Sequence, residues 1–234
     1  MITGARDGAV LTLALARPDR GNALGPDLVE ALLAAVQAAH AETTLHTLVL
    51  RGEGRHFCTG LDLSDLDHSH DADWLWRLVR IETLLDALWR SPLATVALAQ
   101  GRAWGAGADL FAACERRIAA PGASFRFPGA QFGIVLGTRR LAERVGAGAA
   151  RRLVVDGGEL DADAALATGL ATAVGSTADV SAPRIDAVTA RAVRAASRHD
   201  APDTDLAALV RSAAEPGLKA RIQAYRQRVL ATRS

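Results

Sequence analysis

Residues 101–110 read GRAWGAGADL and residues 54–63 read GRHFCTGLDL, so the chain contains two similar glycine-bearing turns. Each turn follows a run typical of a strand and precedes a segment expected to be helical. A helix N-terminus presents backbone N–H groups without intrahelical partners and carries a partial positive charge. Two such termini aimed at one point would form a two-donor oxyanion hole, and small residues would let a ligand carbonyl approach closely.

Each turn taken alone has a simpler explanation, because glycines before a helix are common in ordinary turns. The second turn does not match the dinucleotide-binding fingerprint, and it lacks the Gly-Lys-Ser/Thr of a P-loop. The sequence therefore gives no argument for a nucleotide cofactor.

Outward from these turns, the apolar pattern predicts strands and helices in alternation. The expected strands are residues 10–16, 45–50, 93–99 and 117–120. The expected helices begin at Pro26 and near Ser64, cover residues 73–89 and 109–114, and dominate from Leu141 onward. This order predicts an α/β domain of repeated strand–strand–helix turns. We expect a core over residues 1–182 and a C-terminal helical region over residues 183–234 that serves packing or oligomerisation.

Composition limits the class of protein. Of 234 residues, 50% are hydrophobic and 23% charged, as in ordinary globular proteins. A chain of this length buries about 70% of its unfolded surface, so it needs no disulfide or metal to fold. The formal net charge of +1 gives no bulk field that favours nucleic acid or an anionic membrane. Two isolated cysteines, no signal peptide and no apolar run of about 18 residues predict a cytoplasmic protein.

The two turns, in this order, resemble signatures of the enoyl-CoA hydratase/isomerase (crotonase) superfamily. Residues 54–62 resemble G-x-F-x-x-G-x-D, and residues 101–107 are similar to G-x-x-x-G-G-G. The likeness extends over nearly the whole chain. Residues 17–24 resemble the family's R-P-x-x-x-N-A-L, residues 156–170 its T-G-x-x-x-x-A…G-L-V segment, and residues 224–228 its C-terminal A-F-x-E-K-R.

The resemblance implies a crotonase-like spiral of ββα units, a homotrimer or dimer of trimers, and an acyl-CoA substrate. Coenzyme A would enter as part of the substrate, with no other cofactor and no metal. By position, the thioester carbonyl would accept hydrogen bonds from the backbone N–H groups of Leu61 and Ala106. A thioester enolate carries its charge on that oxygen, and losing one such donor lowers the rate by about 10²–10³.

The same resemblance assigns substrate or CoA contacts to residues around the turns. These are Arg20, Ala23, Thr59, Gly60, Asp62, Leu63, Trp104, Gly105 and Gly129. The guanidinium of Arg20 suits the phosphates of the nucleotide, with a solvated turn charge as the alternative. Asp62 also fits a structural role near a helix start, and Trp104 is expected to touch the acyl group.

The chain departs from the hydratase pattern at both catalytic glutamates of the family. Asp109 occupies the first position, one helical turn after Ala106, so its side chain can face the same pocket. The second position falls on Gly129, and residues 128–141 contain no carboxylate. Asp109 is therefore the candidate acid or base, with stabilisation of its own helix as the alternative.

One acid suffices for double-bond isomerisation or a slow hydration. Decarboxylation and thioester hydrolysis stay open, because no second acid is assigned. A protein of a different class is also open, namely a binding or assembly subunit that keeps the CoA pocket but has little activity.

Other side chains offer weaker hypotheses. Cys58 adjoins the first turn, but no histidine is evidently placed to activate it as a nucleophile. Residues 68–73, HSHDAD, are more typical of a solvated loop before a helix than of a metal site. Trp74, Trp76 and Trp89 are expected in the core or in a pocket wall.

Overall fold

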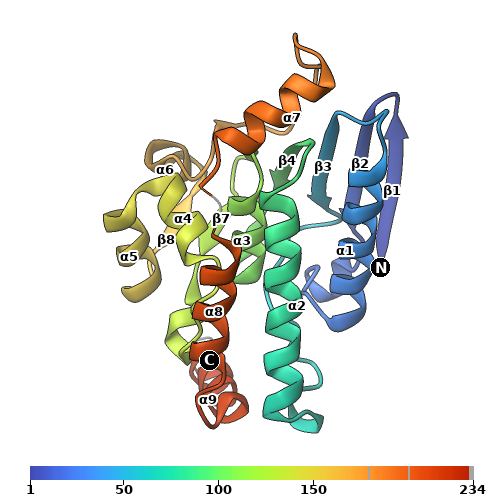
Figure 1. Ribbon diagram of the computed structural model, residues 1–234. Helices are drawn as coiled ribbons and strands as arrows, with labels where there is room; N and C mark the ends of the chain where they lie inside the picture. The colour runs from blue at the N-terminus through green and yellow to red at the C-terminus, as the bar shows by residue number, and fades with distance from the viewer. Residues whose placement is uncertain (179, 200, 232–234) are drawn as a thin grey trace.

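A computed structural model of the chain describes residues 1–178, 180–199 and 201–231. Its main sheet has six strands in the order β1-β2-β3-β4-β6-β9 (Figure 1). The first two strands pair antiparallel, and the later neighbours in this sheet are parallel. The strands are β1 (Ile2–Asp7), β2 (Val10–Leu15), β3 (Thr47–Gly52), β4 (Ala94–Ala99), β6 (Arg116–Ala119) and β9 (Ala173–Val174).

A smaller sheet contains β5 (Arg102–Trp104), β7 (Ser124–Arg126) and β8 (Glu159–Asp161), in that order. Residues 100 and 101 alone separate β4 from β5, so the chain passes almost directly from one sheet to the other. Gly101 makes this corner with a φ of 55°, and a Cβ there would lie 2.2 Å from the Arg55 carbonyl oxygen. Because helix α3 follows β5, this unit runs strand, strand, helix, as the sequence predicts, and β1, β2 and α1 have the same order.

The helices cover the sheets and supply much of the core. Their bounds are α1 (Pro26–Ala41), α2 (Asp71–Trp89), α3 (Ala106–Ala113), α4 (Thr138–Val145), α5 (Ala147–Val155), α6 (Ala162–Thr168), α7 (Ala187–Ala196), α8 (Pro202–Ala213) and α9 (Leu218–Ala231). The described residues also form the short 3₁₀ helices η1 (Pro18–Arg20), η2 (Leu66–His68) and η3 (Pro128–Phe132). Helix α3 is buried along its whole length. Apart from Asp109 its side chains are apolar, and a helix that is apolar on nearly all sides belongs inside the domain.

The helix expected near Ser64 is wrong, because only the short η2 forms there. Side chains bind the backbone of this segment instead. The Asp62 carboxylate accepts the Ser64 N–H at 3.0 Å, and the Ser69 hydroxyl donates to the Leu66 carbonyl at 3.0 Å. Such local bonds compete with helical hydrogen bonding.

The prediction for the tryptophans holds for two of the three. Trp74 and Trp89 are buried, but Trp76 is 62% exposed. Neighbours two positions apart on a helix point about 200° apart. Trp74 and Trp76 therefore lie on opposite faces of α2, and only one of them can reach the core.

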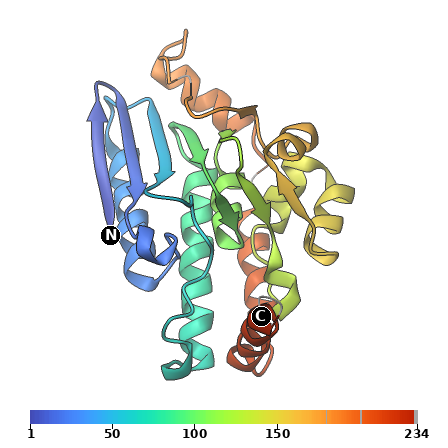
Figure 2. The same ribbon diagram turned by 180° about the vertical axis from the view of Figure 1, so that it is seen from behind.

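The C-terminal segment is helical, as predicted, and α8 and α9 pack back against α2 (Figure 2). They share an apolar cluster with the preceding chain. The cluster consists of Leu66, Trp74, Leu78, Ile134, Leu209, Ala213, Leu218 and Ile222. A boundary at residue 182 and a role in oligomerisation stay predictions.

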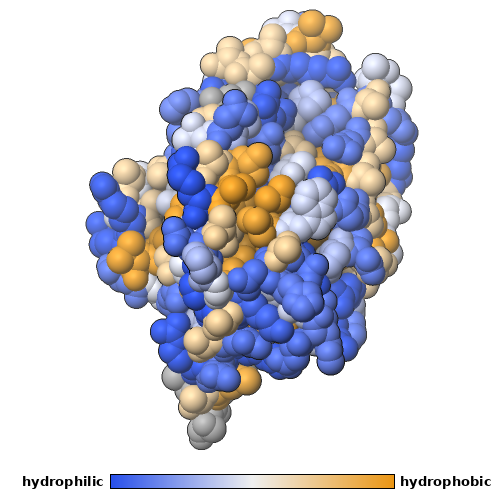
Figure 3. Space-filling model, turned by 60° about the horizontal axis from the view of Figure 1, so that its bottom comes forward, coloured by the Kyte–Doolittle hydropathy of each residue, from blue (hydrophilic) through white to orange (hydrophobic). Residues whose placement is uncertain are grey.

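Hydrophobic residues gather near the centre of the face in Figure 3, with hydrophilic residues around them. On α7, Val188 and Val193 are exposed by 78% and 54%.

Within the described part of the chain, no helix is both long and apolar enough to cross a bilayer.

Candidate active site

The two glycine-bearing turns meet in the structure. The Cys58 N–H donates to the Arg102 carbonyl at 3.1 Å, and the Trp104 N–H donates to the Cys58 carbonyl at 3.0 Å. Glycine is required at the junction, because a Cβ on Gly107 would lie 2.2 Å from the Cys58 carbonyl oxygen. Likewise, a Cβ on Gly60 would lie 2.8 Å from the Trp104 carbonyl oxygen. The small residues of the motifs therefore let one turn pack directly on the other.

Both predicted donor residues line one cavity. Leu24 donates to the Gly60 carbonyl at 2.7 Å and accepts the Asp62 N–H at 3.1 Å. In this parallel bridge, the N–H of Leu61 itself points away from Leu24. Ala106 is the first residue of α3, where a backbone N–H has no intrahelical partner. Two N–H groups from different segments thus come from the wall of the same cavity.

The cavity has a volume of about 140 Å³ and a largely apolar lining. Residues from both turns, α2, α3, η3, the segment after η3 and α9 surround it. The lining residues are Thr59, Gly60, Leu61, Leu63, Leu78, Ile81, Trp104, Gly105, Ala106, Asp109, Phe127, Pro128, Gly129, Ala130, Phe132, Ile134, Leu136, Thr138, Val154, Ile222 and Tyr225. An apolar pocket with few convergent polar groups is typical of small-molecule sites.

Asp109 is the one carboxylate among these described lining residues. It is 6% exposed, and its carboxylate packs against the backbone at Gly137, where a Cβ would lie 2.3 Å from Oδ1. Burial raises the pKa of Asp109 well above its ordinary range; the charge of Glu82 adds to this rise, and Arg140 opposes it. A carboxyl group with a raised pKa in a cavity is suited to proton transfer near neutral pH.

Gly129 also lines the cavity, within η3, so the second position of the family pattern carries no functional side chain. The next carboxylate along the chain, Glu143, lies outside this cavity and pairs with His199 at 3.2 Å. Among the described lining residues, the cavity therefore offers a single carboxyl group.

The other predicted contacts divide into two groups. Five of them line the cavity, namely Thr59, Gly60, Leu63, Trp104 and Gly105. Arg20, Ala23 and Asp62 lie outside the lining. The Arg20 side chain is 57% exposed, and Ala23 is buried. Their contacts with the nucleotide part of a substrate stay predictions.

Asp62 has a structural partner that sequence reasoning missed. Arg17 donates to its carboxylate at 2.9 Å and to the Ala23 carbonyl at 3.2 Å. The pair ties the N-terminal RPDRGNAL segment to the first turn. Both residues stand in motifs visible in the sequence, but only folding brings them together.

Trp104 forms part of the cavity wall, and its indole ring also contacts three side chains from β5 and β7. The Trp104 Nε1–H donates to the Ser124 hydroxyl at 3.0 Å. The guanidinium carbons of Arg102 and Arg126 lie 4.5 and 5.2 Å from the ring centre. These contacts fix the ring by cation–π attraction.

Cys58 is fully buried, and burial raises the pKa of its thiol to about 12. A buried thiol with a raised pKa is a poor nucleophile near neutral pH, because the thiolate is the reactive form. Within the described residues, no group of three or more His, Cys, Asp or Glu could hold a metal ion.

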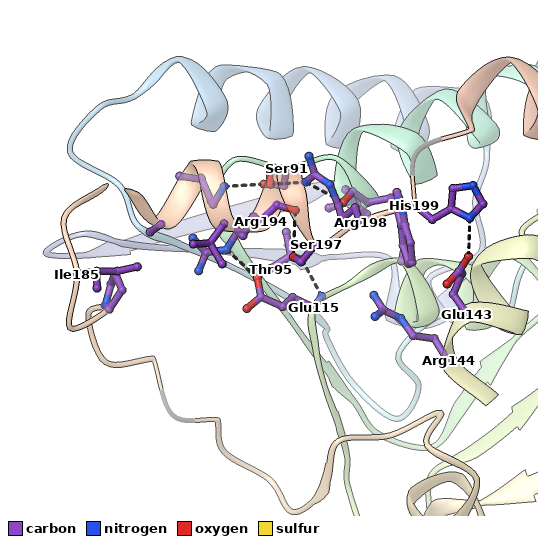
Figure 4. A pocket seen from close by; sticks show the side chains of 17 residues that line it. Ser91, Thr95, Glu115, Glu143, Arg144, Ile185, Arg194, Ser197, Arg198 and His199 are labelled. Carbon is purple, nitrogen blue, oxygen red and sulfur yellow. Dashed lines mark hydrogen bonds and ion pairs between the residues drawn. The ribbon is translucent and has the colours of Figure 1, made fainter. Parts of the chain in front are cut away.

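A larger cavity of about 430 Å³ lies beneath α7 and beside the end of α2 (Figure 4). Charged side chains that line it already interact with other residues of the chain. Arg194 pairs with Glu115 at 2.8 Å, and Arg198 donates to the Ser91 carbonyl at 3.0 Å. Neither glycine-bearing turn reaches it. The chemistry predicted from the sequence therefore belongs to the smaller cavity.

A buried ionic network lies close to Asp109. Arg140 on α4 is 1% exposed and donates to both oxygens of Glu82 on α2, at 2.7 and 3.1 Å. It also lies 3.4 Å from Asp205 on α8, whose carboxylate in turn accepts hydrogen bonds from the Nε and Nη2 groups of Arg139. The network joins three helices behind the cavity.

Replacing Arg140 by Met is expected to lower the free energy of unfolding by about 3–5 kcal/mol, because Glu82 would stay buried without its partner. Urea unfolding followed by circular dichroism measures the change. The double variant with Glu82→Leu removes both charges and should regain most of the loss. An Arg140→Met protein as stable as the wild type would show that the pair does not support the fold.

The mostly parallel sheet, the spiral of strand–strand–helix units and the cavity between two glycine turns define the class of protein. Residues 5–228 match the enoyl-CoA hydratase/isomerase family model, and the chain belongs to that family. The Mycobacterium leprae protein named "Probable enoyl-CoA hydratase echA6" is 39% identical over 179 residues, which cover 74% of this chain and 70% of the relative.

Solved structures confirm the crotonase-like fold. A protein from Bordetella parapertussis described as a "putative enoyl-CoA hydratase/isomerase" is 43% identical and superposes with a TM-score of 0.90, covering 96% of this chain and 97% of that one. An enoyl-CoA hydratase from Bacillus halodurans is 23% identical, with a TM-score of 0.82 and coverage of 95% and 99%, and shares the fold. The predicted family and fold class are therefore both confirmed.

Proposed function

We propose that the protein is an acyl-CoA enzyme that stabilises a thioester enolate with the backbone N–H groups of Leu61 and Ala106. Asp109 is its single acid/base. The observation that carries this proposal is the convergence of both donor residues and one buried carboxylate on a single apolar cavity. Coenzyme A enters only as part of the substrate, and the assembly is a homotrimer or a dimer of trimers.

The physical basis is electrostatic. When a nucleophile adds to the double bond, or a proton leaves the carbon next to the thioester, negative charge collects on the thioester oxygen. Two fixed N–H donors stabilise that charge without reorganising, and the apolar lining strengthens their effect. The mechanism requires the thioester oxygen to lie within hydrogen-bond distance of the backbone N–H groups of Leu61 and Ala106.

Asp109 alone can carry out each proton transfer that hydration or isomerisation needs. In hydration, water oxygen bonds to the third carbon, its proton passes to the Asp109 carboxylate, and the electron pair moves to the thioester oxygen. The protonated Asp109 then returns the proton to the second carbon as the enolate collapses. In isomerisation, the carboxylate removes a proton from the second carbon and delivers it to the fourth.

Gly129 favours a second candidate function. Without a carboxylate at that position, the chain could act as a CoA-ester-binding subunit with weak activity. Acyl-CoA decarboxylation and thioester hydrolysis are further alternatives, since each also uses stabilisation of charge on the thioester oxygen.

Incubation with crotonyl-CoA tests the proposal. Loss of the conjugated enoyl-thioester absorbance, with 3-hydroxybutanoyl-CoA as the product, is the expected result for a one-acid hydratase. Free CoA would indicate hydrolysis, and vinylacetyl-CoA converted to crotonyl-CoA would indicate isomerisation. Tight binding of acyl-CoA with no turnover of any of these substrates would favour the binding subunit.

A further inference from the structure

Helix α9 is fastened to the rest of the chain at its first turn. The Asp71 carboxylate, at the start of α2, accepts the backbone N–H groups of Gly217 at 3.0 Å, Leu218 at 3.2 Å and Lys219 at 2.8 Å. A carboxylate at a helix N-terminus satisfies donors that the helix itself leaves unpaired. The start of α9 is thus held against the start of α2, far from it in sequence.

Further contacts fasten α9 to η3, the segment that carries Gly129. Arg221 donates to the carbonyl groups of Phe132 and Gly133, both at 3.2 Å. Arg228, two turns later, donates to the Gln131 carbonyl at 2.9 Å. Because these bonds flank the middle of the helix, the position of α9 over η3 is fixed along its length.

Between these attachments, α9 presents two side chains to the cavity. Ile222 is 1% exposed and belongs to the apolar cluster shared with α2. The Tyr225 ring packs on Phe132, with ring centres 5.0 Å apart. Both α9 residues line the cavity that holds Leu61 and Asp109. The helix therefore forms an apolar wall of the candidate active site.

We infer that α9 limits the length of the acyl chain through Ile222 and Tyr225, so that the preferred substrates carry short acyl groups. This inference rests on the proposed function and names the substrate class of the same site. The cavity volume of about 140 Å³ is close to that of an apolar cavity of about 150 Å³ that accepts a benzene-sized ligand. An acyl group of about six carbons fills such a space.

The test measures dissociation constants of saturated acyl-CoAs by titration calorimetry, which needs no turnover. The series runs from butanoyl-CoA through hexanoyl-CoA and octanoyl-CoA to dodecanoyl-CoA. Each added methylene that is buried should improve affinity about fourfold. We expect wild-type affinity to rise up to hexanoyl-CoA and then to fall by about tenfold or more at dodecanoyl-CoA, since the chain meets the α9 wall.

Tyr225→Ala should move the best ligand to a longer chain, and Tyr225→Leu, which keeps an apolar side chain, should move it less. Leu230→Ala is the matched control, because Leu230 lies on the same helix but is 56% exposed and outside the cavity lining. Identical chain-length profiles for the wild type and Tyr225→Ala would overturn the inference alone. A wild-type protein that binds none of the acyl-CoAs would overturn the proposed function as well.

Discussion

Asp109→Asn is expected to lower kcat/KM with crotonyl-CoA by about 10²–10⁴-fold, because the amide cannot take up and return a proton. The substitution keeps the size of the side chain, so butanoyl-CoA should bind with nearly unchanged affinity. Steady-state kinetics and calorimetry measure the two quantities separately. An unchanged rate in a protein with measurable turnover would leave Asp109 with a structural role in α3.

The pH dependence follows from the environment of Asp109. The proposed reaction begins with the ionised carboxylate, so kcat/KM should rise with pH as Asp109 loses its proton. Burial and the charge of Glu82 raise the pKa of Asp109, which places this rise above the pH range of an ordinary aspartate. Glu82→Gln removes a negative charge, lowers the pKa of Asp109, and should shift the rise toward lower pH.

Stability gives an independent check on the same group. A carboxyl group whose pKa is raised in the folded state stabilises the fold at pH values below its unfolded-state pKa. This contribution is lost as the pH rises from the unfolded-state pKa through the folded-state pKa. The wild type should therefore lose stability between these two pKa values, whereas Asp109→Asn should lose less. Thermal unfolding at several pH values measures the difference. Parallel curves for the two proteins would contradict the raised pKa.

Ala106→Pro is expected to lower kcat by about 10²–10³-fold, because proline lacks the N–H that is proposed to bind the thioester oxygen. The first position of a helix is the one that accepts proline best, since its N–H has no intrahelical partner. Gly105, which precedes it, has φ 54° and ψ −130°, a conformation open to glycine. The fold should therefore tolerate the change.

Ala187→Pro is the matched control. Ala187 is the first residue of α7, is exposed, and lies outside both cavities described above. Both variants should unfold at temperatures near that of the wild type, and only Ala106→Pro should lose turnover. If the two variants were equally active, the N–H of Ala106 would have no part in the reaction.

Much of the fold could be predicted from local patterns. The strands β2, β3, β4 and β6 lie within about two residues of the expected ranges, because alternation and apolar runs are local signals. The C-terminal region was expected to be helical and is. The prediction of a helix near Ser64 was wrong, because hydrogen bonds from side chains replace the helical ones there. The prediction that Trp76 is buried was wrong, because composition does not show which face of α2 is buried.

By itself, the sequence determined the two turns and the candidate acid. Glycines and small residues at fixed spacing indicate a close backbone approach, and Asp109 lies one helical turn from Ala106, so both signals are local. Only the tertiary structure decided what surrounds Asp109. Arg140 meets Glu82 across 58 positions, and Asp71 meets α9 across about 147. Such pairs leave no periodic trace in the chain, because their geometry depends on how whole helices pack.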